Sequence, residues 1–162
     1  MEKAFIKTKP CKKIETFDAD KKPNGWVLEI VSDKDNFTKH IRGQIYLTVV
    51  EPGLFKGYHV HAAADLFITC LDGQVASIIY KNKNTKREIP MGGDNFKTVF
   101  VPKGYLHGIK NIGKSQAKVL VYRYPAWMPA LEEQLFVSSK NVGNGETWIK
   151  IKKFLKEFNE KK

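Results

Sequence analysis

The sequence predicts an all-β fold, a barrel or sandwich of short strands that ends in one amphipathic α-helix. Over most of the chain, segments rich in β-branched and aromatic residues alternate with polar turns that contain glycine. Many short strands separated by such turns are typical of sandwiches and barrels. Apolar residues recur at helical spacing only near the C-terminus. We therefore expect strands first and a single helix last.

The first expected strand follows an Asn24-Gly25 turn, and the next begins at a second glycine, Gly43. Later strands are separated by the polar turns at residues 81–86 and 92–95. The expected strands are residues 25–31, 43–50, 66–70, 74–81, 98–101 and 118–124. Together they predict a barrel over about residues 25–129.

At the C-terminus, Trp148, Ile151, Leu155 and Phe158 recur at helical spacing among lysines. This pattern predicts an amphipathic helix over about residues 146–160. Its apolar stripe is expected to pack against the barrel or against a partner subunit, and it carries no chemistry. With 162 residues, the chain is long enough for one core, so residues 1–162 are expected to form a single domain.

Composition limits the class of protein. An apolar fraction of 42% and 19 aromatic residues exclude disorder as the default state. No run of 18 apolar residues is present and the N-terminal residues are polar, so a cytoplasmic protein without a membrane segment is expected. Cys11 and Cys70 are then expected to be free thiols, with Cys70 a small core residue in an apolar strand.

The net charge of +11 has two interpretations. The lysines are scattered along the chain and gather only after Lys150, which is the pattern of a solvated surface. Alternatively, the summed positive field favours an anionic ligand such as a nucleotide diphosphate. No helix-turn-helix, zinc-finger spacing or aromatic RNA-binding signature is visible, so nucleic acid is not an expected partner.

Three of the four histidines fall in two short segments, each of which has the form strand, glycine turn and strand. Residues i and i+2 of a strand share a face, so His59 and His61 can both point into one interior. Asp65 stands at even spacing and joins them if the strand stays regular. His107 arrives from a neighbouring strand after a turn that Pro102 pre-forms. The fourth histidine, His40, lies in a polar stretch and is expected on the surface.

The two segments resemble the two motifs of the cupin superfamily of small β-barrels, which implies a double-stranded β-helix, or jelly-roll barrel. The second segment, Pro102-x-Gly104-x-x-His107-x-x-x-Asn111, matches its motif at every named position. The first, from Gly53 to Gly73, has aspartate where glutamate is usual, and its closing glycine comes one residue late.

Three segments carry a narrower resemblance: Gln44-x-Tyr46-x-Thr48, Lys56-Gly57-x-His59-x-His61 and Pro102-x-Gly104-Tyr105-x-His107-Gly108. Over roughly residues 25–129 the chain resembles the dTDP-4-dehydrorhamnose 3,5-epimerase family. This resemblance implies proton chemistry beside the C4 ketone of a dTDP-4-keto-6-deoxyhexose, a nucleotide-diphosphate sugar substrate, no cofactor or metal, and a homodimer.

The resemblance also implies roles for individual residues. His59 matches the general base, and a histidine suits that task near neutral pH. Lys56 matches an arginine beside the base and would stabilise the developing enolate oxygen. Tyr122, which shares a strand face with Tyr124, is the expected general acid. Gln44, Tyr46 and His107 are expected to bind the substrate, and Glu132 or Glu133 could replace the aspartate that orients the base in that family.

Three alternatives remain open at this point. The run from Gly57 to His61 also resembles sugar 3,4-ketoisomerases, in which His59 and His61 together would move a ketone along the sugar. His59, His61, Asp65 and His107 could instead hold Fe(II), Mn, Ni or Zn in a metal-dependent dioxygenase or isomerase. Finally, the chain could be a sugar-binding cupin without catalytic activity.

Overall fold

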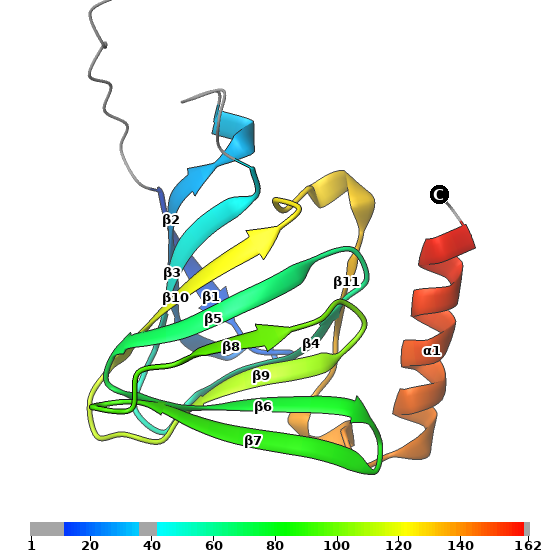
Figure 1. Cartoon of the computed structure of the whole chain (residues 1–162). Coiled ribbons are helices and arrows are strands. Elements are labelled where there is room, and N and C mark those ends of the chain that lie inside the picture. The colour runs from blue at the N-terminus through cyan, green and yellow to red at the C-terminus, as the bar shows by residue number, and fades with distance from the viewer. Residues whose placement is uncertain (1–11, 36–41, 161–162) are drawn as a thin grey trace, which may run out of the picture.

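A computed structural model describes residues 12–35 and 42–160 of the chain. Two antiparallel β-sheets face each other, and the one α-helix of the described residues lies beside them (Figure 1). The larger sheet has the strand order β1-β2-β3-β10-β5-β8. In chain order its strands are β1 (Lys12–Phe17), β2 (Pro23–Ser32), β3 (Gln44–Val50), β5 (Asp65–Asp72), β8 (Thr98–Val101) and β10 (Ala117–Tyr124).

The smaller sheet has the order β11-β4-β9-β6-β7. Its strands are β4 (Phe55–His61), β6 (Gln74–Asn82), β7 (Thr85–Gly92), β9 (Leu106–Asn111) and β11 (Gln134–Phe136). Three short 3-10 helices, η1 (Asp33–Asp35), η2 (Pro129–Leu131) and η3 (Ser139–Asn141), lie in the connections. The sequence pattern did not predict β1, β7 or β11, because these segments lack the apolar runs that mark the others.

The space between the sheets is filled in part by an apolar cluster. It contains Val50, Leu66, Ile68, Cys70, Val75, Met91, Val99, Val101, Ile109, Ala117, Val119 and Val121. Cys70 is a free, buried thiol, as its apolar strand predicted, whereas Cys11 and His40 lie outside the described residues. The remaining interior forms a pocket, which the apolar cluster borders through Leu66, Ile68 and Val121.

Helix α1 (Gly145–Glu160) begins where the side chain of Asn144 accepts the backbone N–H of Glu146. Its apolar stripe, including Trp148 and Ile151, packs in a second cluster with Tyr58 and other residues of the smaller sheet. Of the two packing partners that the sequence left open, the barrel is therefore the one observed. The predicted class, all-β with one C-terminal helix, is confirmed.

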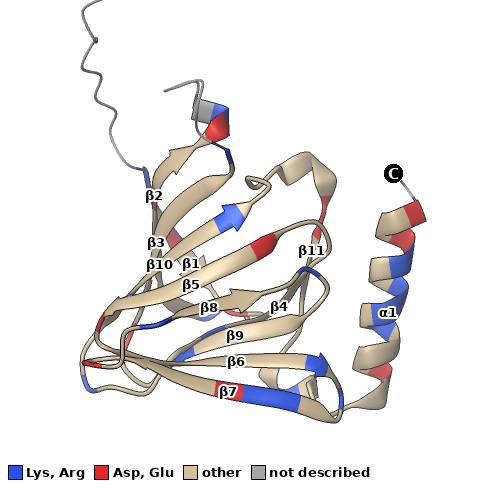
Figure 2. Ribbon diagram, viewed as in Figure 1, with Lys and Arg blue, Asp and Glu red and all other residues tan. Residues whose placement is uncertain are grey.

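Lysines and arginines occur on strands of both sheets and along α1, interspersed with acidic residues (Figure 2). Charges of both signs that are spread over the surface in this way are typical of a solvated surface. Within residues 12–35 and 42–160, no helix combines the length and apolar character needed to span a bilayer.

Candidate active site

The pocket between the two sheets has a volume of about 590 Å³ and opens to solvent. It brings together six residues that the sequence singled out: Gln44, Tyr46, Lys56, His59, His61 and His107. The three histidines and the lysine come from β4 and β9 of the smaller sheet. Gln44 and Tyr46 come from β3 of the larger sheet. A ligand in this pocket would therefore lie between two chemically different walls.

From Tyr58 to His61, after a register shift in the pairing with β9 between Gly57 and His59, strand β4 turns its histidines inward by alternation. Tyr58 and Val60 face outward and pack in the cluster that includes α1, so His59 and His61 must face the pocket. His107 on β9 is directly paired with His59. The predicted convergence of three imidazoles from two strands is thus present in the structure.

The three imidazoles form a tight group. The ring centroid of His59 lies 4.4 Å from that of His107 and 5.0 Å from that of His61, and the His61 and His107 centroids are 5.5 Å apart. One ligand atom from each ring lies within 4.8 Å of the others. Such a group can hold a single small species, either a proton in transfer or a metal ion.

Burial keeps two of these rings neutral. Burial, followed by the charges of His107, His61 and Arg123, lowers the pKa of His59 well below its ordinary value. Burial and the charge of His61 lower the pKa of His107 to about 3. Both rings therefore have a free lone pair at neutral pH. The buried Nδ1 of His59 has no hydrogen-bond partner among the described residues.

His61 is held by a buried carboxylate. Its Nδ1 lies 3.1 Å from Oε1 of Glu133, and the same oxygen accepts a 2.7 Å bond from Nη2 of Arg123. The backbone N–H of Ala63 donates to the other carboxylate oxygen at 3.3 Å. Burial alone raises the pKa of Glu133, but its bonds and charge interactions with His61 and Arg123 outweigh burial and lower it. This ionised carboxylate fixes the orientation of the His61 ring.

Lys56 places a buried amine on the wall of the pocket. Its Nζ donates to the carbonyl of Trp26 at 3.0 Å and to Oγ1 of Thr48 at 2.9 Å. Burial lowers its pKa to about 7, with the charge of Glu51 opposing that shift. An ammonium group has three donors, so one remains for a ligand in the pocket.

On the wall formed by the larger sheet, the side-chain amide of Gln44 is hydrogen-bonded to other groups of the protein. Its Nε2 donates to Oε2 of Glu29 at 2.7 Å, and its Oε1 accepts the backbone N–H of Trp127 at 3.2 Å. The indole of Trp127 is 48% exposed and lines the pocket. Both ends of the Gln44 amide are therefore bonded to other groups of the protein, Glu29 and Trp127.

Tyr122 does not reach the histidines. On β10, Val121 and Arg123 line the pocket, and alternation turns Tyr122 to the outer face of the larger sheet. There its hydroxyl donates to the carbonyl of Arg42 at 3.2 Å, and its ring stacks on Phe67 with centroids 5.8 Å apart. The predicted general acid is thus on the wrong face, because Tyr122 stands one residue away from the positions of β10 that face the pocket.

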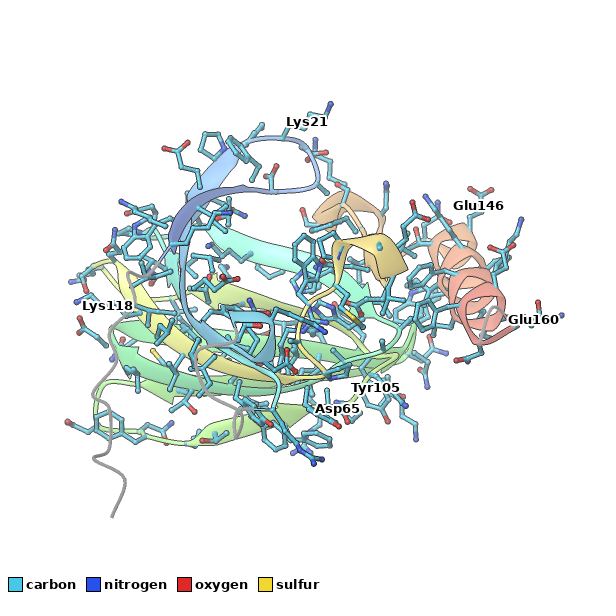
Figure 3. The ribbon with its side chains drawn as sticks, turned by 90° about the horizontal axis from the view of Figure 1, so that it is seen from above. Lys21, Asp65, Tyr105, Lys118, Glu146 and Glu160 are labelled. Carbon is cyan, nitrogen blue, oxygen red and sulfur yellow. The ribbon has the colours of Figure 1, made fainter. Side chains whose placement is uncertain are left out.

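Asp65 also stands apart from the histidine cluster. The chain leaves the smaller sheet after His61, and Asp65 begins β5 in the larger sheet, so the even spacing no longer sets its direction. Its Oδ1 accepts the backbone N–H of Lys103 at 2.9 Å. Figure 3 shows Asp65 and Tyr105 near each other, at the end of the barrel away from Lys118. Among the described residues, the group suited to a metal contains the three histidines without Asp65.

Sequence analysis named Glu133 only as one of two substitutes for an orienting aspartate, and it missed Arg123. Arg123 had no local signal, because only the register of β10 shows that its face of the strand points into the pocket. The structure pairs Glu133 with His61 instead of His59. Glu132, by contrast, is exposed, with a left-handed backbone at φ 45°.

Residues 21–134, most of the chain, match the model of the polysaccharide biosynthesis C-terminal domain. The spore coat polysaccharide biosynthesis protein SpsL of Bacillus subtilis (strain 168) is 27% identical over 111 residues, which are 65% of this chain and 73% of SpsL.

Solved structures show the same fold. The capsular polysaccharide assembling protein CapF from Staphylococcus aureus superposes with a TM-score of 0.65 at 20% identity, over 81% of this chain and 35% of that one. Bacillus subtilis oxalate decarboxylase OxdC gives a TM-score of 0.61 at 18% identity, over 86% of this chain and 33% of that one. The chain thus spans about a third of each of these longer proteins and has their cupin fold. It belongs to the polysaccharide biosynthesis C-terminal domain family.

Proposed function

We propose that this chain is a nucleotide-sugar epimerase or isomerase that removes a proton beside the ketone of a 4-keto sugar. The observation that carries the proposal is the cluster of His59, His61 and His107 on one wall of a pocket that also holds a buried lysine. The family match and the name of SpsL support a role in making sugars for a polysaccharide. A cytoplasmic location is part of this proposal.

In this proposal His59 is the general base. Its side chain lines the pocket and its ring is neutral, so it has a lone pair that can accept a proton. Lys56 donates to the carbonyl oxygen, which becomes an enolate oxygen as the proton leaves. His61, held by Glu133, would move a proton between neighbouring carbons if the reaction is that of a ketoisomerase.

Product analysis tests this function directly. The purified protein is incubated with a dTDP-4-keto-6-deoxyhexose, and the products are separated and identified by NMR. We expect an inverted centre beside the ketone for an epimerase, or a 3-keto sugar for a ketoisomerase. Unchanged substrate at high protein concentration would contradict both forms of the proposal.

The pH dependence of turnover should report on Lys56. Because burial lowers its pKa to about 7, Lys56 is a cation below this pH and neutral above it. Turnover that needs the cation should therefore fall as the pH rises through about 7. The variant Lys56→Met should lose about 10²–10³-fold in kcat and show no such decline in its residual activity. A wild-type profile that is flat or rises through this range would contradict the role of Lys56.

A second candidate is a metal-dependent sugar isomerase, which the close approach of the three imidazoles favours. The donor set fits a divalent ion such as Zn²⁺: His59 and His107 are held neutral, and Glu133 orients His61 as carboxylates orient metal-bound histidines. An ion held by His59, His61 and His107 would polarise the ketone as a Lewis acid. The chain's own residues would still bind the sugar and move the proton.

Metal analysis separates the two candidates. If the second holds, protein titrated with Zn²⁺ should bind one equivalent, and both His61→Ala and His107→Ala should lose that binding. Activity should then disappear after chelation and return with added metal. Full activity in protein that contains no metal would contradict the metal-dependent candidate and leave the first one standing.

We also propose that the protein pairs with a second copy through the outer face of its larger sheet. Phe67 and Phe100 are 39% and 51% exposed there, with ring centroids 5.0 Å apart, and Tyr122 extends the same row. The outward face of an antiparallel sheet is usually polar when it meets water. An aromatic row in that position is the kind of surface that subunit interfaces bury.

A further inference from the structure

The structure suggests which residue supplies the proton that completes the proposed reaction. The pocket has two walls, and all three histidines lie on the smaller sheet. A sugar ring between the walls would turn one face toward the imidazoles. Its other face would meet β3 and β10 of the larger sheet, where Tyr46, Thr48, Val121 and Arg123 line the pocket. An acid on this second wall could reach the side of the ring that the histidines cannot.

Tyr46 is the residue on that wall with suitable chemistry. Among the described residues that line the pocket, it is the one tyrosine. The Tyr46 hydroxyl forms no hydrogen bond with a described residue, so the group is available to a ligand. In the strand register, Tyr46 is paired directly with Val121, the residue that precedes Tyr122. Tyr122 turns its phenol away from the pocket on β10, and Tyr46 presents one to the pocket from the adjacent strand, β3, at a directly neighbouring position.

The surroundings keep this phenol protonated. Burial raises the pKa of Tyr46 to about 12, while the charge of Arg123 lowers it and that of Glu133 raises it. The proton is therefore in place at neutral pH. Arg123 offers positive charge to the phenolate that remains after the proton has left.

We propose that Tyr46 is the general acid that protonates the enolate from the wall opposite the histidines; this rests on the proposed function. The base accepts the proton of the C–H bond, and the electron pair of that bond moves into the ketone to form the enolate. The enolate carbon then forms a new C–H bond with the Tyr46 proton, which leaves a phenolate. The phenolate regains a proton from solvent as the histidine releases its own, so no oxidant or other reactant is consumed.

This arrangement determines the stereochemical outcome. A proton that leaves toward one wall and returns from the other inverts the carbon, whereas exchange through the histidines alone returns it to the same face. Tyr46 therefore makes inversion the expected reaction of this pocket. Removal of its hydroxyl should separate proton exchange from inversion.

The test compares wild type, Tyr46→Phe and Tyr124→Phe with a dTDP-4-keto-6-deoxyhexose in D2O. Tyr124 is a half-exposed residue at the end of β10 that does not line the pocket, so Tyr124→Phe is the matched control. Deuterium at the carbons beside the ketone and the amount of inverted product are followed by NMR. We expect Tyr46→Phe to lose about 10²–10⁴-fold in inversion while it still takes up deuterium with retention. The control should match wild type in both.

Other outcomes would overturn the inference. Normal inversion in Tyr46→Phe would show that another group is the acid. A parallel loss of uptake and inversion in Tyr46→Phe, with unchanged thermal stability, would assign Tyr46 to substrate binding. Inversion by wild type that proceeds without deuterium uptake would defeat the proton chemistry itself. Wild type that neither exchanges nor inverts would defeat the proposed function first.

Discussion

Replacing His59 with alanine should lower kcat by about 10²–10⁴-fold, which is the usual contribution of a general base. His59 lies between His107 on β9 and Phe136 on β11, and it pairs directly with both. Its Nδ1 makes no hydrogen bond to a described residue, so removal of the ring breaks no polar contact at that atom. We therefore expect a folded and inactive protein.

The measurement is steady-state turnover of the 4-keto sugar nucleotide together with thermal unfolding. His59→Gln is the second variant, because it keeps a polar side chain in the pocket without a group that can act as a base near neutral pH. It should be as inactive as His59→Ala. Turnover within a few-fold of wild type in either variant, with folding unchanged, would remove His59 from the reaction.

Replacing Glu133 with alanine should have the largest effect on stability. Glu133 is 2% exposed and connects His61 to Arg123, which is 3% exposed. The variant leaves a buried guanidinium without its carboxylate, and breaking a buried pair in this way costs about 3–5 kcal/mol. Denaturant unfolding should show that decrease. Glu132→Gln, at the exposed neighbouring residue, is the control and should unfold like wild type.

Glu133 should also matter for turnover, because it positions His61. Loss of such a partner typically costs about 10–100-fold in activity. The double variant Arg123→Met, Glu133→Leu separates the two effects, since apolar residues of similar volume can replace a buried ion pair without loss of stability. It should recover stability and remain impaired in turnover. Recovery of both would mean that Glu133 only stabilises the fold.

The histidine cluster could be predicted from the sequence because it depends on local geometry. Alternation along one strand places His59 and His61 on one face, and a turn after Pro102 brings His107 into the neighbouring strand. The same local rule failed for Asp65, because the chain crosses to the other sheet between His61 and Asp65. Spacing in sequence therefore predicts a shared face only while the strand continues.

Residues that depend on the pairing of distant segments were harder to predict. Tyr122 and Val121 differ by one position, and only the register of β10 against β3 shows which of them faces the pocket. Glu133 reaches His61 because β11, a strand of three residues without a clear pattern, pairs with β4. The longer strands of the barrel and the C-terminal helix were easier to predict, since their apolar patterns extend over many residues.

Deuterium uptake by the wild-type reaction tests the central claim most directly. Metal-analysed protein is mixed with a dTDP-4-keto-6-deoxyhexose in D2O, and the C3 and C5 positions are followed by NMR and mass spectrometry. Enzyme-dependent uptake at one or both of these carbons is the result we expect from a histidine base beside a ketone. A protein that binds the sugar nucleotide in this pocket yet leaves every carbon-bound proton in place would contradict the account.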